Sequence, residues 1–493
     1  MADAPDDDRA DGRGRVDRRS VLKYGGSSAA AVTLAGCQSP QNPLPGSGIR
    51  NSDDGDEDPG GNGNGNGDGD GDSDGEGLLA GETVRIGILA PMSLPLGQSM
   101  WDGARLAAKQ HNDNGGMLGA DVEVKLGDTE VKPAKAASEH RRLIRQENCD
   151  FTMGIFLGAA LIQTFPSIAS LGKVHITTAS ADPRAGQLVS TTNTFTQDTG
   201  EEEYEKFKYH FRAGPINLLD LADAMLEFIE NQREDRGWER VAVMTENVGE
   251  FTPYHDRLVA SLSEILEVPI VKRVGGVSDW SPIYNNIEGE DCDLALVGLA
   301  LIGTSAVNQW ANQERDFEFG GIHVPSQSFG YWESTAGNTE YVYTMNAMTP
   351  QTSNTELTQP FVEAYMDEFD RVPIYSGAIT YDAVTLTEQT LRKTMEEEGI
   401  EGEIPEADTM IPYMEDNTYT GSTIMSEFQF TPEDANYAHE PNWTSIEETG
   451  VPVFQQWQMD PEVREDYGTM HSFYPDENKT ADYAVPHWME GGG

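Results

Sequence analysis

Basic residues are scarce in this chain of 493 residues. It has 33 Lys and Arg against 84 Asp and Glu, only 11 of the basic residues are lysines, and the formal net charge is -51. The first 81 residues contribute -9 of this charge, so -42 belongs to the part that follows. A surface of this sign repels phosphate backbones, which excludes nucleic acid as a partner. It is typical of proteins that work in concentrated salt, where screening shortens charge repulsion to a few ångströms.

Cysteine is also rare, with single residues at positions 37, 149 and 292. Cys149 and Cys292 each introduce an apolar stretch in a different part of the chain, and neither belongs to a CxxC pair or a histidine-rich cluster. A disulfide framework and a metal site are therefore not expected. We expect two buried free thiols instead, because an unpaired cysteine behaves as a small apolar side chain.

Sequence motifs of enzymes are missing as well. The chain has no G-x-S-x-G elbow, no P-loop, no HExxH and no glycine-rich dinucleotide fingerprint. Its nine histidines are scattered, and His111 and His140 fall on apolar helix faces, where a packed core histidine is expected. Paired carboxylates are so frequent in this acidic chain that they carry no signal. We predict neither an enzyme activity nor a cofactor.

Residues 1–36 have the order of an export signal. The pair Arg18-Arg19 precedes an apolar stretch at 24–35, which is too short to span a bilayer, and no other apolar run is long enough to span one. Paired arginines favour the twin-arginine (Tat) route. The residues Leu-Ala-Gly before Cys37 resemble a lipobox, which would make Cys37 the lipidated first residue of the mature protein. A buried N-terminal helix is the alternative.

Residues 37–81 are rich in Gly, Asn and Asp and are acidic. They offer almost no apolar side chains to bury, so we predict a disordered tether. A tether after a lipid-anchored cysteine predicts a location at the extracellular face of the cell membrane, where the body that follows could reach a membrane partner.

From residue 82 onward the pattern alternates between strand and helix. Apolar strands are predicted at 84–89, 122–126, 151–155 and 174–177, with helices between them, and the pattern restarts with strands at 241–245, 270–274, 294–297 and 322–324. Helices at 357–369 and 379–398 and strands at 428–430 and 451–459 follow. This order predicts an α/β protein with parallel sheets covered by helices on both faces. We assign lobe 1 to 82–212 and 347–422, and lobe 2 to 213–346 and 423–490.

Six stretches of the body carry a family resemblance through their order and spacing. They read VRIGILAPMS (84–93), GARLA with NDNGG (103–107 and 112–116), Asp128 with PAKA (133–136), ITTASA (176–181), FR (211–212) and YDA (381–383). Together they resemble the branched-chain amino acid and amide type of periplasmic binding protein, in an acidic version similar to haloarchaeal proteins. The resemblance implies the type I fold of this family, with two doubly wound lobes joined by several hinge crossovers. It also implies a small-molecule ligand in the crevice, closure about the hinges, and recognition by an ABC permease.

Loops at the ends of strands are where we expect the ligand. The candidate ligand-binding residues are Ser93, Leu96, Gly158, Ala159, Ala179 and Ser180 in the first lobe, and Phe251, Tyr254, Gln327 and Ser328 in the second. Small residues at 158–160 would leave backbone N–H groups open at a helix N-terminus, which suits a carboxylate, although a tight turn without ligand is the alternative. By resemblance, an aromatic side chain near Phe251 covers the ligand.

The resemblance also bears on ligand type. Members that bind amino acids use a hydroxyl or carbonyl set in lobe 1 and an acid in lobe 2. The similar positions here hold Gly158 or Ala159, then Ala181, and in lobe 2 Gln327 and Ser328. A zwitterion without those partners would lose several kcal/mol, so an amide, an aromatic compound or a small organic acid fits as well as an amino acid. A ligand sensor for a membrane receptor and a cell-surface structural protein are alternative functions.

Overall fold

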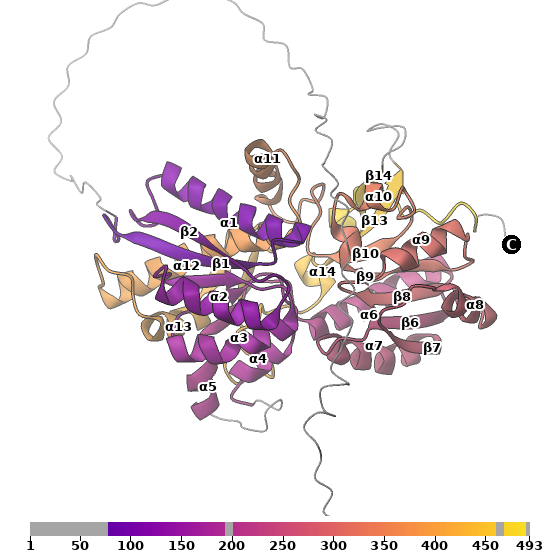
Figure 1. Cartoon of the computed structure of the whole chain (residues 1–493), viewed down its shortest axis with the longest axis horizontal. Coiled ribbons are helices and arrows are strands. Elements are labelled where there is room, and N and C mark those ends of the chain that lie inside the picture. The colour runs from indigo at the N-terminus through magenta and orange to yellow at the C-terminus, as the bar shows by residue number, and fades with distance from the viewer. Residues whose placement is uncertain (1–76, 193–200, 460–467, 490–493) are drawn as a thin grey trace, which may run out of the picture. The chain divides into compact units, whose positions relative to one another are not determined.

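The computed structural model describes residues 77–192, 201–459 and 468–489 (Figure 1). The predicted signal peptide, the lipidation site at Cys37 and the predicted tether as far as residue 76 lie outside the described residues. The last five residues of that tether belong to the folded body instead. Leu79 is fully buried, and its N–H donates to the carbonyl of Leu118 over 2.8 Å. The fold therefore begins before the predicted boundary, because two adjacent leucines follow the polar stretch.

Five parallel strands form the sheet of the first lobe, in the order β2-β1-β3-β4-β5. They are β1 (Thr83–Ala90), β2 (Asp121–Asp128), β3 (Phe151–Gly154), β4 (His175–Thr177) and β5 (His210–Arg212). The helices of this part are α1 (Pro95–Asp113), α2 (Pro133–Arg145), α3 (Gly158–Leu171), α4 (Arg184–Val189) and α5 (Glu201–Phe207). The strand order reverses direction between β1 and β3, which is the doubly wound arrangement.

The sheet of the second lobe repeats this order and extends it. Its strands run β7-β6-β8-β9-β10 in parallel, and β13 and β14 are added antiparallel beyond β10. They are β6 (Arg240–Glu246), β7 (Glu267–Val274), β8 (Leu294–Leu299), β9 (Glu318–His323), β10 (Tyr343–Asn346), β13 (Val453–Met459) and β14 (Gly468–Tyr474). The helices are α6 (Leu218–Arg236), α7 (Phe251–Ile265), α8 (Ser281–Gly289), α9 (Thr304–Asn312) and α10 (Tyr331–Ser334). The prediction of two doubly wound α/β lobes is confirmed.

The strand predicted at 322–324 is only the end of β9. This strand begins at Glu318, and residues Val324–Gln327 form a 3-10 helix. A glutamate followed by two glycines is not typical of a buried strand, which is why its first half was not recognised. Pro325 ends the strand pattern because proline has no N–H to donate to a ladder.

The remaining elements connect the lobes. They are α11 (Thr358–Phe369), α12 (Tyr375–Glu398), α13 (Ala407–Glu415), β11 (Thr418–Thr420), β12 (Glu427–Gln429) and α14 (Ile446–Thr449). The described chain crosses between the lobes after β5, after β10 and after β12. No helix in the described ranges has both the length and the apolar character needed to cross a membrane.

The third crossover lies later than the predicted lobe boundary at 422/423. Strand β12 pairs with β11, and the ring of His439 stacks on Phe211 of β5 with centroids 3.9 Å apart. By contrast, the N–H of Ile446 already donates to Glu227 on α6 over 2.9 Å. These contacts favour a boundary close to residue 443.

Both predicted free thiols are present. Cys149 and Cys292 are buried and form no disulfide. Burial raises the pKa of Cys149 to about 12 and that of Cys292 to about 11, so both side chains stay protonated and unreactive at neutral pH.

Candidate functional site

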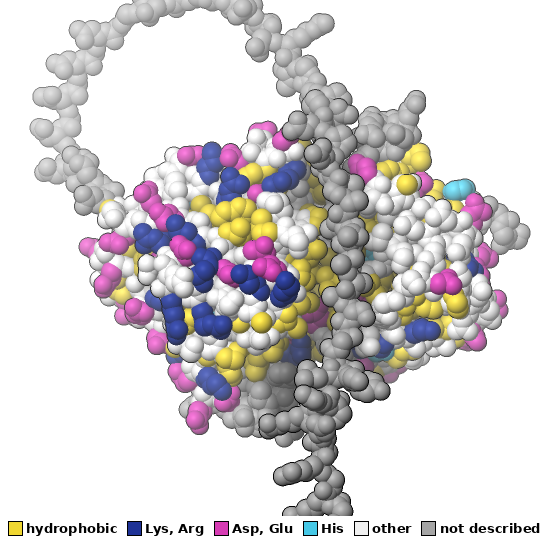
Figure 2. Space-filling view, in the orientation of Figure 1, with side chains coloured by type: hydrophobic (Ala, Val, Ile, Leu, Met, Phe, Trp, Pro, Cys, Tyr) yellow, Lys and Arg dark blue, Asp and Glu magenta, His cyan; other side chains and the backbone are white. Residues whose placement is uncertain are grey.

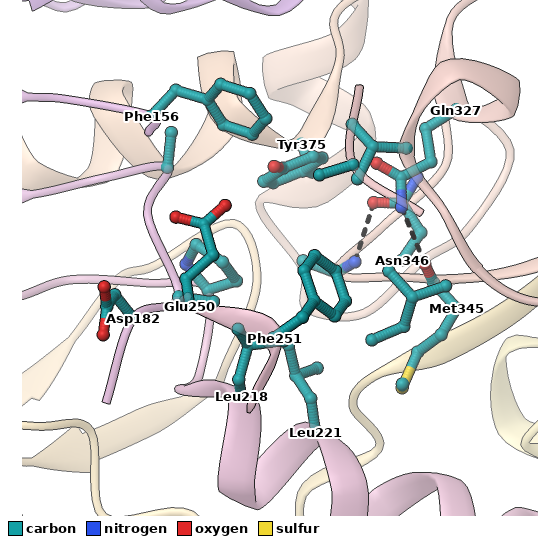
Figure 3. Close-up of a pocket in the computed structure, with 17 residues that line it drawn as sticks. Phe156, Asp182, Leu218, Leu221, Glu250, Phe251, Gln327, Met345, Asn346 and Tyr375 are labelled. Carbon is teal, nitrogen blue, oxygen red and sulfur yellow. Dashed lines mark hydrogen bonds between the residues drawn. The ribbon is translucent and has the colours of Figure 1, made fainter. Parts of the chain in front are cut away.

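A pocket opens where strands of both sheets end (Figure 3). Its lining comes from the loops that follow β3, β4, β5, β6, β8, β9 and β10 and from the beginnings of α6 and α12. The lining residues are Phe156, Ala179, Ala181, Asp182, Pro215, Leu218, Leu221, Glu250, Phe251, Ala300, Ile322, Val324, Gln327, Met345, Asn346, Ala347 and Tyr375. The empty space between its walls is about 610 Å³, including the part open to solvent.

Most of this lining is apolar. Phe156, Phe251 and Tyr375 surround the central space in Figure 3, and Leu218 and Leu221 lie along its lower edge in that view. The ring of Phe251 is fixed by a T-shaped contact with the buried ring of Tyr254 on the same helix, with the two centroids 5.8 Å apart. Walls of this kind favour a ligand with an apolar body.

A hydrogen bond between a carboxylate of one lobe and a helix N-terminus of the other lies at the edge of the pocket. Glu250, the residue before α7, accepts from the backbone N–H of Gly158 over 2.5 Å through Oε2. Gly158 begins α3, and Leu157 before it offers no side-chain cap, so Glu250 takes an N–H that the helix leaves unpaired. We predicted that the N–H groups at 158–160 would be open to a ligand, with a tight turn without ligand as the alternative. In this structure the N–H of Gly158 is bound by a carboxylate of the chain itself.

The loop after β4 brings a second carboxylate to the pocket. Asp182 is buried, and both of its carboxylate oxygens accept from Arg184 Nε, over 2.9 and 3.1 Å. The carbonyls of Ser180 and Asp182 accept from the guanidinium of Arg212, which forms a fully buried ion pair with Glu440. Because Arg212 belongs to β5, the last strand before the first crossover, the loop is fixed to the core of the first lobe.

The two carboxylates influence each other. A Cβ atom on Gly158 would overlap both Glu250 Oε2 and Asp182 Oδ2, so the two carboxylates flank this glycine. Burial, and after it the charge of Asp182, raise the pKa of Glu250, whereas the Gly158 N–H and Arg184 lower it, and the net value is about 7. Glu250 therefore changes its charge near neutral pH, which is typical of functional sites.

The second lobe adds two amides. Gln327 Nε2 donates to the carbonyl of Met345 over 2.8 Å, while Gln327 Oε1 is buried and accepts no hydrogen bond from the described residues. Asn346 donates to Gln455 Oε1 and accepts from the N–H of Ala347, each over 2.8 Å. Asn346 is thus satisfied by the protein, whereas the buried Oε1 of Gln327 has no partner among the described residues.

The pocket includes Ala179, Phe251 and Gln327 from the predicted site, and Gly158 stands beside it. Six other predicted residues do not line it: Ser93 and Ala159 are exposed, Leu96 and Tyr254 are core residues, Ser180 is buried with its hydroxyl accepting from the Asp182 N–H, and Ser328 lies outside the lining. Whether any of the ten binds a ligand stays a prediction.

Several lining residues were not predicted. Asp182 follows the ITTASA stretch directly, so extending that strand-end loop by one residue would have found it. Tyr375 gave no such signal, because it begins a helix that follows no strand of either sheet. The described residues include no group of three or more His, Cys, Asp or Glu placed to hold a metal ion.

Comparisons with known proteins agree with this arrangement. The family model described as periplasmic binding protein matches residues 83–450. A putative branched-chain amino acid ABC transporter from Silicibacter pomeroyi matches with a TM-score of 0.65 at 18% identity, covering 83% of this chain and 100% of that one. Among the curated protein sequences, none matches this chain.

Two further solved structures contain ligands. The branched-chain amino acid transporter substrate-binding protein from Streptococcus pneumoniae, in complex with isoleucine, has a TM-score of 0.59 at 17% identity, covering 79% of this chain and 100% of its own. A solute-binding protein of an ABC transporter from R. palustris, in complex with benzoate, has a TM-score of 0.58 at 14% identity, covering 83% of this chain and 99% of its own. Identities this low demonstrate a shared fold.

Proposed function

The chain belongs to the periplasmic binding protein family, and from this premise we propose that it is the extracytoplasmic solute-binding component of an ABC importer. It binds one small molecule per chain and delivers it to a membrane permease. The family and its structural neighbours are solute-binding proteins, not enzymes. The observation that carries the proposal is the pocket at the carboxyl ends of two similar doubly wound sheets, lined from both lobes.

The ligand class that we propose is an amino acid, an amide or a small organic acid. The three aromatic side chains and the leucines of the pocket support an apolar body, and the carboxylates and amides support a small polar end. Isoleucine and benzoate, the ligands in the complexes of two structural neighbours, each have a polar end on an apolar body.

Binding is proposed to close the lobes about the crossovers. The first crossover follows β5 and passes Pro215, which lines the pocket, and the second passes Ala347, which also lines it. A ligand that contacts both the crossovers and the two lobes would stabilise one relative position of the lobes over others.

The location follows from the predicted leader. We propose that Cys37 is lipidated and holds the protein at the extracellular face of the membrane. When the full chain is expressed, a Cys37→Ser variant should appear in the medium and lose the mass of the lipid group, while binding by the body stays unchanged. Equal membrane retention of both proteins would contradict the anchor.

A thermal-shift screen of the full chain in high salt tests the binding function. The panel contains amino acids, amides and small organic acids, and a true ligand at 100 times its Kd should stabilise the fold by about 2.7 kcal/mol. Calorimetric titration of each hit should give one site per chain.

A matched pair of variants ties binding to the pocket. Ala181 lines the pocket and is partly exposed to it, whereas Ala260 is exposed on α7 and does not line it. Ala181→Trp should fill the pocket and abolish binding of the hit, and Ala260→Trp should leave it intact. Equal binding by both variants, or no hit from the whole panel, would overturn the proposal.

A further inference from the structure

On the basis of the binding function proposed above, we infer that the polar end of the ligand is a cationic amine and that the pocket disfavours any ligand with a carboxylate. This ligand class departs from the classes that the family likeness supports, because a cationic amine is neither a zwitterionic amino acid nor an amide nor an organic acid. It follows from the charges at the pocket, the occupied end of α3 and one unpaired acceptor.

Among the described residues that line the pocket, the charged side chains are two carboxylates, Asp182 and Glu250. Arg184 is the basic residue beside them, and it is engaged by Asp182 through its Nε and its backbone N–H. The charge of Arg184 compensates that of Asp182, so the net charge at the pocket is that of Glu250. An ammonium group next to Glu250 gains attraction, whereas a carboxylate meets repulsion in a partly buried site.

The N–H of Gly158 at the beginning of α3 is already occupied. The N–H of Gly158 would be the natural donor for a ligand carboxylate, but Glu250 Oε2 already accepts from it over 2.5 Å. A ligand carboxylate would have to displace Glu250 and would then share the space with it and with Asp182. The chain thus supplies the carboxylate of this site itself, and in Figure 3 that carboxylate points toward the space between Phe156 and Tyr375.

Two further features favour a cation that donates hydrogen bonds. Gln327 is 6% exposed, lines the pocket, and leaves its Oε1 without a donor among the described residues. An ammonium group has only donors, so it matches an unpaired acceptor, whereas a carboxylate has only acceptors. Phe156, Phe251 and Tyr375 also line the pocket, and aromatic rings attract cations that lie over their faces.

Protonation of Glu250 should modulate this preference. The groups that face it are Asp182 from the loop after β4, Arg184 from α4, Glu246 from β6 and Tyr375 from α12. With a pKa of about 7, Glu250 is mostly neutral at pH 6 and mostly charged at pH 8. Affinity for an amine should therefore rise roughly tenfold over this range, since the probe itself stays charged throughout.

Matched probes separate charge from shape. One set consists of leucine, 3-methylbutylamine, 4-methylpentanoate and 4-methylpentanamide, and the other of phenylalanine, 2-phenylethylamine, 3-phenylpropanoate and 3-phenylpropanamide. Each set keeps one apolar body and changes only the polar end. In calorimetric titrations of the full chain at pH 8, we expect the amine of at least one set to bind about tenfold or more tightly than its amino acid and its acid.

Variants of two buried glutamates test whether Glu250 causes the preference for an amine. Glu250→Gln keeps the acceptor for Gly158 but removes the charge, so it should weaken the amine about tenfold and abolish the rise with pH. Glu318→Gln is the control, since Glu318 is buried in β9 of the same lobe and does not line the pocket. It should leave amine binding unchanged.

The outcomes separate this inference from the binding function. Tightest binding by an amino acid or an acid, or an amine preference that survives in Glu250→Gln, overturns the cationic ligand class. If no probe binds, a hit from the broad panel of amino acids, amides and small organic acids overturns the cationic ligand class while the binding function stands. If neither panel yields a ligand, the binding function itself fails.

Discussion

At the residue scale, Glu250 and Gly158 determine the chemistry of the site. The fold brings a helix end and a strand-end loop together, but a glycine at the helix end is what admits two carboxylates beside it. Their contact turns a site that suits anions into one that suits cations. A single substitution at either position should therefore change the ligand without changing the fold.

Gly158→Ala tests this close packing. The added Cβ overlaps Glu250 Oε2 and Asp182 Oδ2, so one carboxylate has to move. We expect a loss of about 1–3 kcal/mol in the free energy of unfolding and a clear loss of ligand affinity. Denaturant titration and calorimetry measure the two effects. Ala159→Ser at the exposed neighbouring position should change neither quantity, and an unaffected Gly158→Ala would show that the carboxylates are not confined there.

His140 gives a prediction about pH. It is fully buried on α2, its Nδ1 lies 2.8 Å from Ser167 Oγ on α3, and burial lowers its pKa to about 4. The unfolded chain therefore binds more protons than the folded one between about pH 6.5 and pH 4. The contribution of neutral His140 to the free energy of unfolding is fully present above pH 6.5. It is lost as the pH falls through this window, which lowers the stability by up to about 3 kcal/mol.

The variant His140→Gln isolates this contribution. Glutamine keeps a hydrogen-bonding partner for Ser167 but does not titrate, so the unfolding free energy of the variant should depend less on pH between 6.5 and 4. Denaturant titrations of both proteins across this range measure the difference. Parallel pH profiles would show that His140 is not held neutral by the fold.

At the scale of elements, the crossing of α1 and α12 positions one wall of the pocket. Gly103 on α1 touches the backbone of Gly377 on α12, since a Cβ on Gly103 would overlap the Gly377 carbonyl. Ser99 on α1 accepts from the N–H of Ile374 over 2.9 Å, which fixes the beginning of α12. Tyr375 is the next residue, so the helix crossing determines where its ring stands in the pocket.

Gly103→Ala should separate these two helices. We expect the protein to lose about 1–3 kcal/mol of stability, as overpacked cores do, and to bind its ligand more weakly because Tyr375 moves with α12. Gly289→Ala is the control. It ends α8 in open space, and the better helix propensity of alanine should leave the stability equal or up to about 1 kcal/mol higher. Equal stability of both variants would argue against a backbone contact at the crossing.

At the scale of the whole molecule, charge is the dominant feature. Many of the basic side chains in the described ranges form ion pairs, such as Lys135 and Arg142 with Glu139 on α2. Figure 2 shows dark blue basic side chains next to magenta acidic ones on the visible face of the first lobe. The acidic excess that remains repels itself at low salt, and exposed ion pairs compensate little of it.

Stability should therefore increase with ionic strength. The Debye length falls from about 10 Å at 0.1 M to about 3 Å at 1 M, so most of the self-repulsion is screened at molar salt. We expect the melting temperature of the full chain to rise steeply between 0.1 and 1 M KCl, as measured by calorimetry. Sucrose at matched osmolality controls for effects of solute exclusion and should raise it much less. A flat response to KCl would contradict an adaptation to concentrated salt.

Much of the fold could be predicted from the sequence. Buried strands such as β1 and β8 are continuous apolar runs, and helices such as α2 carry an apolar stripe, so their period alone identifies them. Prediction failed where the residues were atypical, as with Glu318 and the two glycines of β9. It also failed at the third crossover, where stacking on Phe211 decides on which lobe a segment packs.

By itself, the sequence determined the acidic surface, the two free thiols and the two doubly wound sheets. These depend on composition and local periodicity, and each residue contributes to them independently of distant partners. Only the tertiary structure decided the site, because Glu250 meets Gly158 across 92 residues of chain and Tyr375 arrives on a helix packed against α1. Such contacts depend on how the elements pack, which no local pattern records, and they decide which charge the pocket presents to a ligand.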